Sequence, residues 1–138
     1  MLRTVIAVLA GLLAALLLIM GAEKFAHWLS PLPGNLKLED KLALANAMYK
    51  APVTLYLALL AGYAVAAFAG GLAAALLSER NPTRNAVVVG CLLTIAGIAN
   101  LASLPHVPWF WGSLLVYIPL AWLGARLVTA RHMPPGMD

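Results

Sequence analysis

The chain has 138 residues, of which 63% are hydrophobic and 10% are charged, whereas a soluble domain carries about 25% charged residues. Its net charge of +4 comes from Lys and Arg residues spread between apolar segments, a pattern that argues against a surface for binding nucleic acid. Because each membrane-spanning helix needs roughly 20 apolar residues, a chain of this length forms one membrane domain with little room for a catalytic domain.

Four uncharged apolar segments are each long enough to cross a bilayer. They cover residues 4–22, 51–78, 86–104 and 107–125. The polar sequence ERNPTRN joins the second and third segments, and only a few residues around Pro105 and His106 join the third and fourth. Such short connections make neighbouring helices run antiparallel, so the sequence predicts an all-α, up-down four-helix bundle in a membrane.

The first connection is longer and covers residues 23–50. It contains the turn-forming sequence SPLPGN, after which apolar residues recur at helical spacing: Leu38, Leu42, Ala45 and Tyr49. The polar residues between them fall on other faces, which predicts a short amphipathic helix on the membrane surface.

The short connections also carry an orientation signal. The connection between the second and third segments contains Arg80 and Arg84, while the one between the third and fourth contains no Lys or Arg. Because short cytoplasmic loops are enriched in Lys and Arg, the sequence predicts that both termini are cytoplasmic.

Small residues are spaced for helix packing in the second segment. Gly62, Ala66, Gly70 and Ala74 recur every four residues, with Gly71 beside them. Small residues let helix backbones approach closely in lipid, where apolar burial drives association only weakly. The ladder predicts close packing inside the bundle, and the alternative is the interface of a homo-oligomer.

The polar residues that could form a site gather at one end of the predicted bundle. Glu23 and His27 are four residues apart and share a face if the first helix continues past Ala22. His106 lies in the last turn, and Asn100 lies near the end of the third segment. Chain parity places Glu23, His27 and His106 on the same side of the membrane, and Asn100 is a candidate wall of the same site. They could bind a lipid or isoprenoid head group, relay protons, or hold a metal ion through Glu23, His27 and His106.

A purely structural interpretation competes with these hypotheses. Glu23 could pair with a neighbouring Lys, and His106 could cap the helix ends in its turn. His27 and Trp28 could anchor the chain at the membrane surface, as could the aromatic run Trp109, Phe110 and Trp111.

Sequence motifs of enzymes and cofactor sites do not occur in the chain. It has no HExxH, no CxxC, no glycine-rich phosphate loop and no nucleophile elbow. Its single cysteine, Cys91, lies in an apolar run and fits ordinary packing. We therefore expect no enzymatic activity and no cofactor.

Five segments resemble those of a family of small bacterial four-helix inner-membrane proteins. They read GAEKFAHWLSPLPG, GYAVAAFAGGLAAAL, AGIANL, LPHVPWFW and IPLAWLGARL, and the resemblance covers most of the chain. It is most specific at Glu23, His27, Gly70-Gly71, Asn100, the Pro-His turn, and Pro119 with Gly124-Ala125-Arg126. Where family members often read Pro-His-Pro, this chain has a valine between His106 and Pro108, which displaces the second proline. The resemblance implies four spans and an inner-membrane location, and it implies no activity.

The sequence leaves two functions open. The first is a multi-pass, non-enzymatic accessory or packing partner of other membrane components, suggested by smooth apolar spans. The second is a small transporter, or a protein that binds a lipid or an ion at the outer end of the bundle. The expected partners are the lipid bilayer and either further copies of the chain or another membrane protein.

Overall fold

The computed structural model describes residues 1–29, 41–50, 52–103 and 108–132. These residues form the helices α1 (Leu2–Leu29), α2 (Lys41–Lys50), α3 (Val53–Leu76), α4 (Pro82–Ser103) and α5 (Tyr117–His132), with the 3₁₀ helix η1 (Pro108–Val116) leading directly into α5. Four helical stretches are long and apolar enough to cross a membrane: α1, α3, α4, and η1 with α5. The predicted all-α four-helix fold is confirmed.

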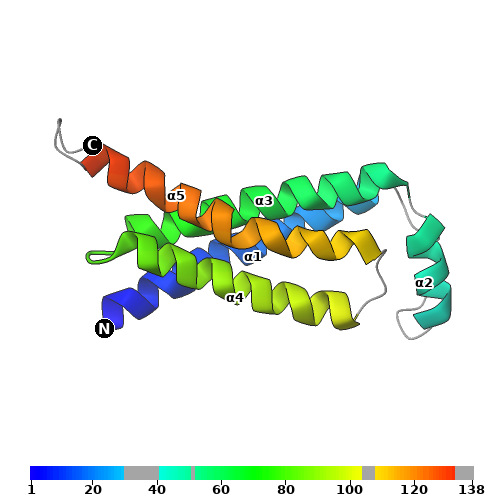
Figure 1. The fold of residues 1–138 in the computed structure, drawn as a ribbon, viewed down its shortest axis with the longest axis horizontal. Coiled ribbons are helices and arrows are strands. Elements are labelled where there is room, and N and C mark those ends of the chain that lie inside the picture. Colours follow the sequence, from blue (N-terminus) through cyan, green and yellow to red (C-terminus); the bar gives the residue numbers. More distant parts are fainter. Residues whose placement is uncertain (30–40, 51, 104–107, 133–138) are drawn as a thin grey trace.

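The four long helices run up and down, and Figure 1 shows the start of α1 and the end of α5 at the same end of the bundle. Helix α3 packs against α1, α4 and α5, and α4 packs against both α5 and α3. Helices α1 and α4 touch each other much less, so the side of the bundle between these two helices is its most open part.

The outer surface of the bundle is lined by large apolar side chains. Leu13, Val65 and Ile95 are each about 60% exposed, whereas the interior contains many fully buried alanines and glycines. This distribution is the reverse of a water-soluble core. It fits a lipid environment, in which large apolar side chains face the acyl chains and small residues face each other.

The predicted small-residue ladder packs inside the bundle. A Cβ atom added at Gly62 would overlap Ala22 of α1, and one at Gly70 would lie 2.8 Å from the Cβ of Ala15. Ala66 and Ala74 are fully buried. Gly71 faces the opposite way, against the backbone of Ala121 in α5.

Several predicted boundaries differ from the observed ones. The first span was expected to end at Ala22, but α1 continues to Leu29. The third was expected to begin at Ala86, but α4 begins at Pro82, because proline suits the first turn of a helix. Asn81 precedes it with a positive φ of 54°, a conformation that asparagine tolerates better than most residues. The buried Asn85 donates from Nδ2 to Ser78 Oγ at 2.7 Å and closes this connection.

The fourth span changes helix type at Tyr117. Residues Pro108–Val116 form a 3₁₀ helix and residues Tyr117–His132 an α-helix. Pro119 lacks an N–H and clashes with the carbonyl four residues before it in an α-helix. The change of helix type puts Pro119 in the first turn of α5, where its missing N–H leaves no intrahelical hydrogen bond broken.

Helix α2 confirms the predicted short helix in the first connection. It lies across the end of the bundle opposite the start of α1 (Figure 1). Leu42 and Tyr49 are 74% and 59% exposed, as expected for side chains that face the membrane surface.

Candidate functional site

A pocket lies inside the bundle, in the half nearer to α2. Its volume is about 160 Å³, similar to an engineered cavity of roughly 150 Å³ that holds a benzene molecule. All four long helices line it, through Leu16, Ile19, Glu23, Tyr63, Leu93, Ala96, Gly97, Asn100 and Tyr117. Leu16 of α1 and Ala96 of α4 are exposed, so the rim of the pocket lies on the open side of the bundle between these helices.

Glu23 enters the pocket because α1 continues past the predicted end of the first span. Ala22 packs against Gly62 of α3, and Ala26 is fully buried. These two contacts fix the rotation of the last turns of α1, so that Glu23 faces α3. At 1.5 Å per residue, Glu23 lies about 9 Å before the end of α1.

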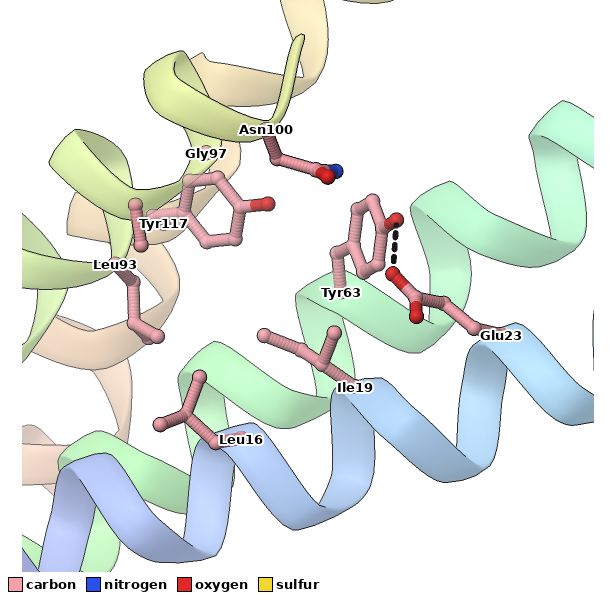
Figure 2. A pocket seen from close by; sticks show the side chains of 9 residues that line it. Leu16, Ile19, Glu23, Tyr63, Leu93, Gly97, Asn100 and Tyr117 are labelled. Atoms are coloured by element: carbon pink, nitrogen blue, oxygen red, sulfur yellow. Dashed lines mark hydrogen bonds between the residues drawn. The ribbon is translucent and has the colours of Figure 1, made fainter. Parts of the chain in front are cut away.

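The carboxylate of Glu23 has a hydrogen-bond donor on the neighbouring helix. The Tyr63 hydroxyl donates to Glu23 Oε1 at 3.2 Å, and Figure 2 shows this bond at one side of the pocket. Tyr63 is 5% exposed and belongs to the aromatic core. The bond therefore ties a half-buried carboxylate to a rigid part of the bundle.

Two further polar groups point into the same space. Figure 2 shows the Tyr117 hydroxyl and the Asn100 amide directed toward the region in front of Tyr63 and Glu23. Within the described part of the chain, neither side chain has a hydrogen-bond partner, although Tyr117 is only 4% exposed. The pocket therefore presents one carboxylate, two phenols and one amide among apolar side chains, and two of these groups have no partner among the described residues.

Aromatic rings form the wall behind these polar groups. The ring centroid of Phe110 lies 5.1 Å from that of Tyr56 and 6.2 Å from that of Tyr63. Tyr63 in turn lies 6.2 Å from Tyr117. The expectation that Phe110 belongs to an aromatic belt at the membrane surface is wrong, because Phe110 is 1% exposed and packs in this core. Trp111 is 42% exposed, as a belt residue would be.

No cationic partner of Glu23 occurs among the described residues. The neighbouring Lys24 is exposed, and the ion pair that the described residues do contain, Arg3 with Glu79, lies at the opposite end of the bundle. The expected pairing of Glu23 with a neighbouring Lys is thus not seen in the described residues. A carboxylate within a membrane bundle is costly unless it is paired or hydrogen-bonded. Among the described residues, the Tyr63 hydroxyl is the group that hydrogen-bonds to Glu23.

The structure brings together only part of the predicted site. Glu23 and Asn100 line one pocket, as their chain positions suggested. His27 is exposed and does not line it, because the buried Ala26 turns that edge of α1 outward. His106 lies outside the described residues. Among the described residues no group of three His, Cys, Asp or Glu side chains is placed to hold a metal ion.

Sequence reasoning missed Tyr63 and Tyr117. Each carries a hydroxyl within an apolar segment, where an unpaired polar group is costly. Tyr56 and Tyr63 are also seven residues apart, which places them on one face of a helix. That pattern could have marked an inward-facing aromatic wall.

Comparison of the chain with protein-family models, with curated proteins and with solved structures finds no match. The resemblance to small bacterial inner-membrane proteins therefore stays a prediction.

Proposed function

We propose that this four-helix membrane protein binds the polar end of a lipophilic molecule in the pocket between α1 and α4. The observation that carries this proposal is a pair of polar groups that open into the pocket beside the Glu23 carboxylate, the Tyr117 hydroxyl and the Asn100 amide, neither of which has a partner among the described residues. Helix packing alone requires no such groups. No fully buried side-chain nitrogen or oxygen among the described residues lacks a partner, so these two groups are accessible from the pocket, where a bound molecule could hydrogen-bond to them.

The position of the pocket supports a ligand that arrives from the bilayer. Its rim residues Leu16 and Ala96 are on the lipid-facing side of α1 and α4, where the two helices touch least. Exposed apolar side chains continue along α1 from this rim, including Leu13 and Leu17. An apolar tail could lie along these side chains in the lipid while the polar end enters the pocket.

Of the two functions suggested by the sequence, the pocket supports the second, a binding protein with its site toward the outer end of the bundle. We propose binding without chemical conversion. Glu23 is the one acidic or basic side chain among the residues that line the pocket, whereas acid–base catalysis usually combines groups with different proton affinities.

Ala96→Phe should empty the pocket by filling its rim. The matched control is Ala102→Phe, which places the same ring at another exposed alanine of α4. Native mass spectrometry of protein extracted together with its surrounding lipid should show a bound lipophilic molecule on the wild type and on Ala102→Phe. We expect that molecule to be largely lost from Ala96→Phe. Equal occupancy of Ala96→Phe and wild type, or an unoccupied wild-type protein, would contradict the proposal.

We also propose that the protein resides in a bacterial inner membrane with both termini in the cytoplasm, which puts α2 and the pocket in the outer half. The support is Arg80 in the connection between α3 and α4 and Arg84 in the first turn of α4. In a Cys91→Ser background, a membrane-impermeant maleimide should label Lys50→Cys in intact cells. Arg84→Cys should be labelled only after permeabilisation. The opposite pattern would reverse the orientation.

A further inference from the structure

We propose that the ligand of this pocket is a lipophilic organic cation, whose positive group pairs with Glu23 beside the rings of Tyr63 and Tyr117. This inference rests on the proposed binding function and adds the charge of the ligand. It draws on three observations: an acid without a cationic partner, an aromatic wall, and the size of the cavity.

Glu23 is the acidic side chain of the pocket, and no cationic side chain among the described residues faces it. Glu23 accepts one hydrogen bond from Tyr63, and the pocket-facing groups of α4 and α5 are the neutral Asn100 and Tyr117. Lys24 and His27 on the same helix are exposed and do not line the pocket. Electrostatic attraction is strong where water is scarce. A cation in this pocket would therefore gain more than a neutral molecule of the same shape, and an anion would be repelled.

The aromatic wall favours the same class of ligand. Cations bind over the faces of aromatic rings within about 6 Å of the ring centroid, and groups of such rings recognise quaternary ammonium ions. The rings of Tyr63 and Tyr117 lie 6.2 Å apart with an interplanar angle of 33°. A cation between Glu23 and these two rings would be in reach of both kinds of attraction.

The size of the cavity sets the size of the charged group. A volume of about 160 Å³ is sufficient for a trimethylammonium group, which is comparable in size to the benzene molecule that fits a cavity of roughly 150 Å³. The apolar remainder of the ligand would extend past Leu16 and Ala96 into lipid. The inferred ligand therefore has a compact cationic head and an apolar body.

Benzyltrimethylammonium and neopentylbenzene form a suitable pair of probes, because they have the same shape and differ in the charged nitrogen. A ligand that binds the folded state raises the thermal unfolding midpoint. In detergent solution, the cation should raise the midpoint of the wild-type protein. Neopentylbenzene should shift the unfolding midpoint of the wild type no more than it shifts the midpoint of Glu23→Gln.

Glu23→Gln tests the counter-charge, and Glu79→Gln is its matched control. Glu79 is an exposed glutamate at the other end of the bundle, so its substitution makes the same change of charge far from the pocket. Glu79→Gln should respond to the cation as the wild type does. Glu23→Gln should need at least about a tenfold higher concentration of the cation for the same shift of its unfolding midpoint, because loss of a desolvated charge pair weakens binding strongly.

The outcomes separate this inference from the proposed function. If neopentylbenzene stabilises the wild type as well as the cation does, or if Glu23→Gln still responds fully, the ligand is not a cation and the binding pocket stands. If neither probe stabilises the wild type, the cation inference fails, and the occupancy of Ala96→Phe then decides the proposed function separately. If Glu23→Gln does not fold, the preference of the wild type for the cation over its isostere remains decisive.

Discussion

Replacement of Gly71 by alanine is expected to destabilise the bundle by roughly 3 kcal/mol, the upper part of the usual range for over-packing. A Cβ atom at position 71 would lie 2.5 Å from Cα and 2.7 Å from the carbonyl carbon of Ala121. These are backbone atoms of α5, so no side-chain rotation relieves the overlap, and α3 and α5 must move apart. Because α5 carries Tyr117, the same movement should widen the pocket.

Gly21→Ala provides the control for the Gly71 substitution. Gly21 lies in α1, and apart from its chain neighbours and the adjoining backbone of that helix no described atom lies within 4 Å of the position of an added Cβ. Alanine has a higher helix propensity than glycine by about 1 kcal/mol, so Gly21→Ala should leave the unfolding midpoint unchanged or raise it. Thermal unfolding of both variants followed by circular dichroism is the measurement. Equal midpoints for Gly71→Ala and the wild type would mean that α3 and α5 are not packed as described.

The fold was predictable because lipid imposes strong constraints. Every spanning segment must satisfy its backbone within a helix, so four apolar segments with short connections leave few alternatives. The Gly and Ala ladder of α3 was also recognisable. Its assignment to internal packing needed the structure, which shows Gly62 against Ala22 and Gly70 against Ala15.

Helix α1 extends to Leu29, beyond the predicted end of the first span at Ala22, because a charged residue such as Glu23 does not by itself end a helix. The sequence AEKFAHWL contains no proline or glycine and has good helix propensity. Glu23 is accommodated by the Tyr63 hydroxyl, a tertiary contact between residues 40 positions apart. Local sequence patterns carry no information on such a contact, and so the position of Glu23 inside the bundle could not be predicted.

For the candidate site, the chain topology predicted only which residues lie toward the same end of the bundle. The sequence suggested Asn100 as a wall of the site that contains Glu23, and both side chains line the same pocket. Chain parity grouped His27 with Glu23, but His27 is exposed and does not line the pocket, because parity gives the end of a helix and not the rotation about its axis. Tyr117 faces the pocket at the point where η1 changes to α5, and the local sequence does not indicate which side chain this change directs inward.

The second large effect is expected from chemical labelling of Glu23. A carboxylate and a proton add across a carbodiimide to form an O-acylisourea, which rearranges to a stable N-acylurea without loss of a leaving group. Dicyclohexylcarbodiimide partitions into the bilayer, whereas a charged, water-soluble carbodiimide stays in the aqueous phase. Glu23 lines a pocket whose rim is on the lipid-facing side of α1 and α4, while Glu79 is 62% exposed at the opposite end of the bundle. The two reagents should therefore select different glutamates.

The most direct test of this account is peptide mass spectrometry of protein in lipid bilayers after treatment with each reagent. We expect dicyclohexylcarbodiimide to modify Glu23 in preference to Glu79, and the water-soluble reagent to show the opposite preference. Ala96→Phe should reduce the modification of Glu23, and Ala102→Phe should not. The contradicting result has two parts: the water-soluble reagent modifies Glu23 as readily as Glu79, and dicyclohexylcarbodiimide does not modify Glu23 in preference to Glu79. This result would show that Glu23 faces water and not a pocket that opens to the bilayer.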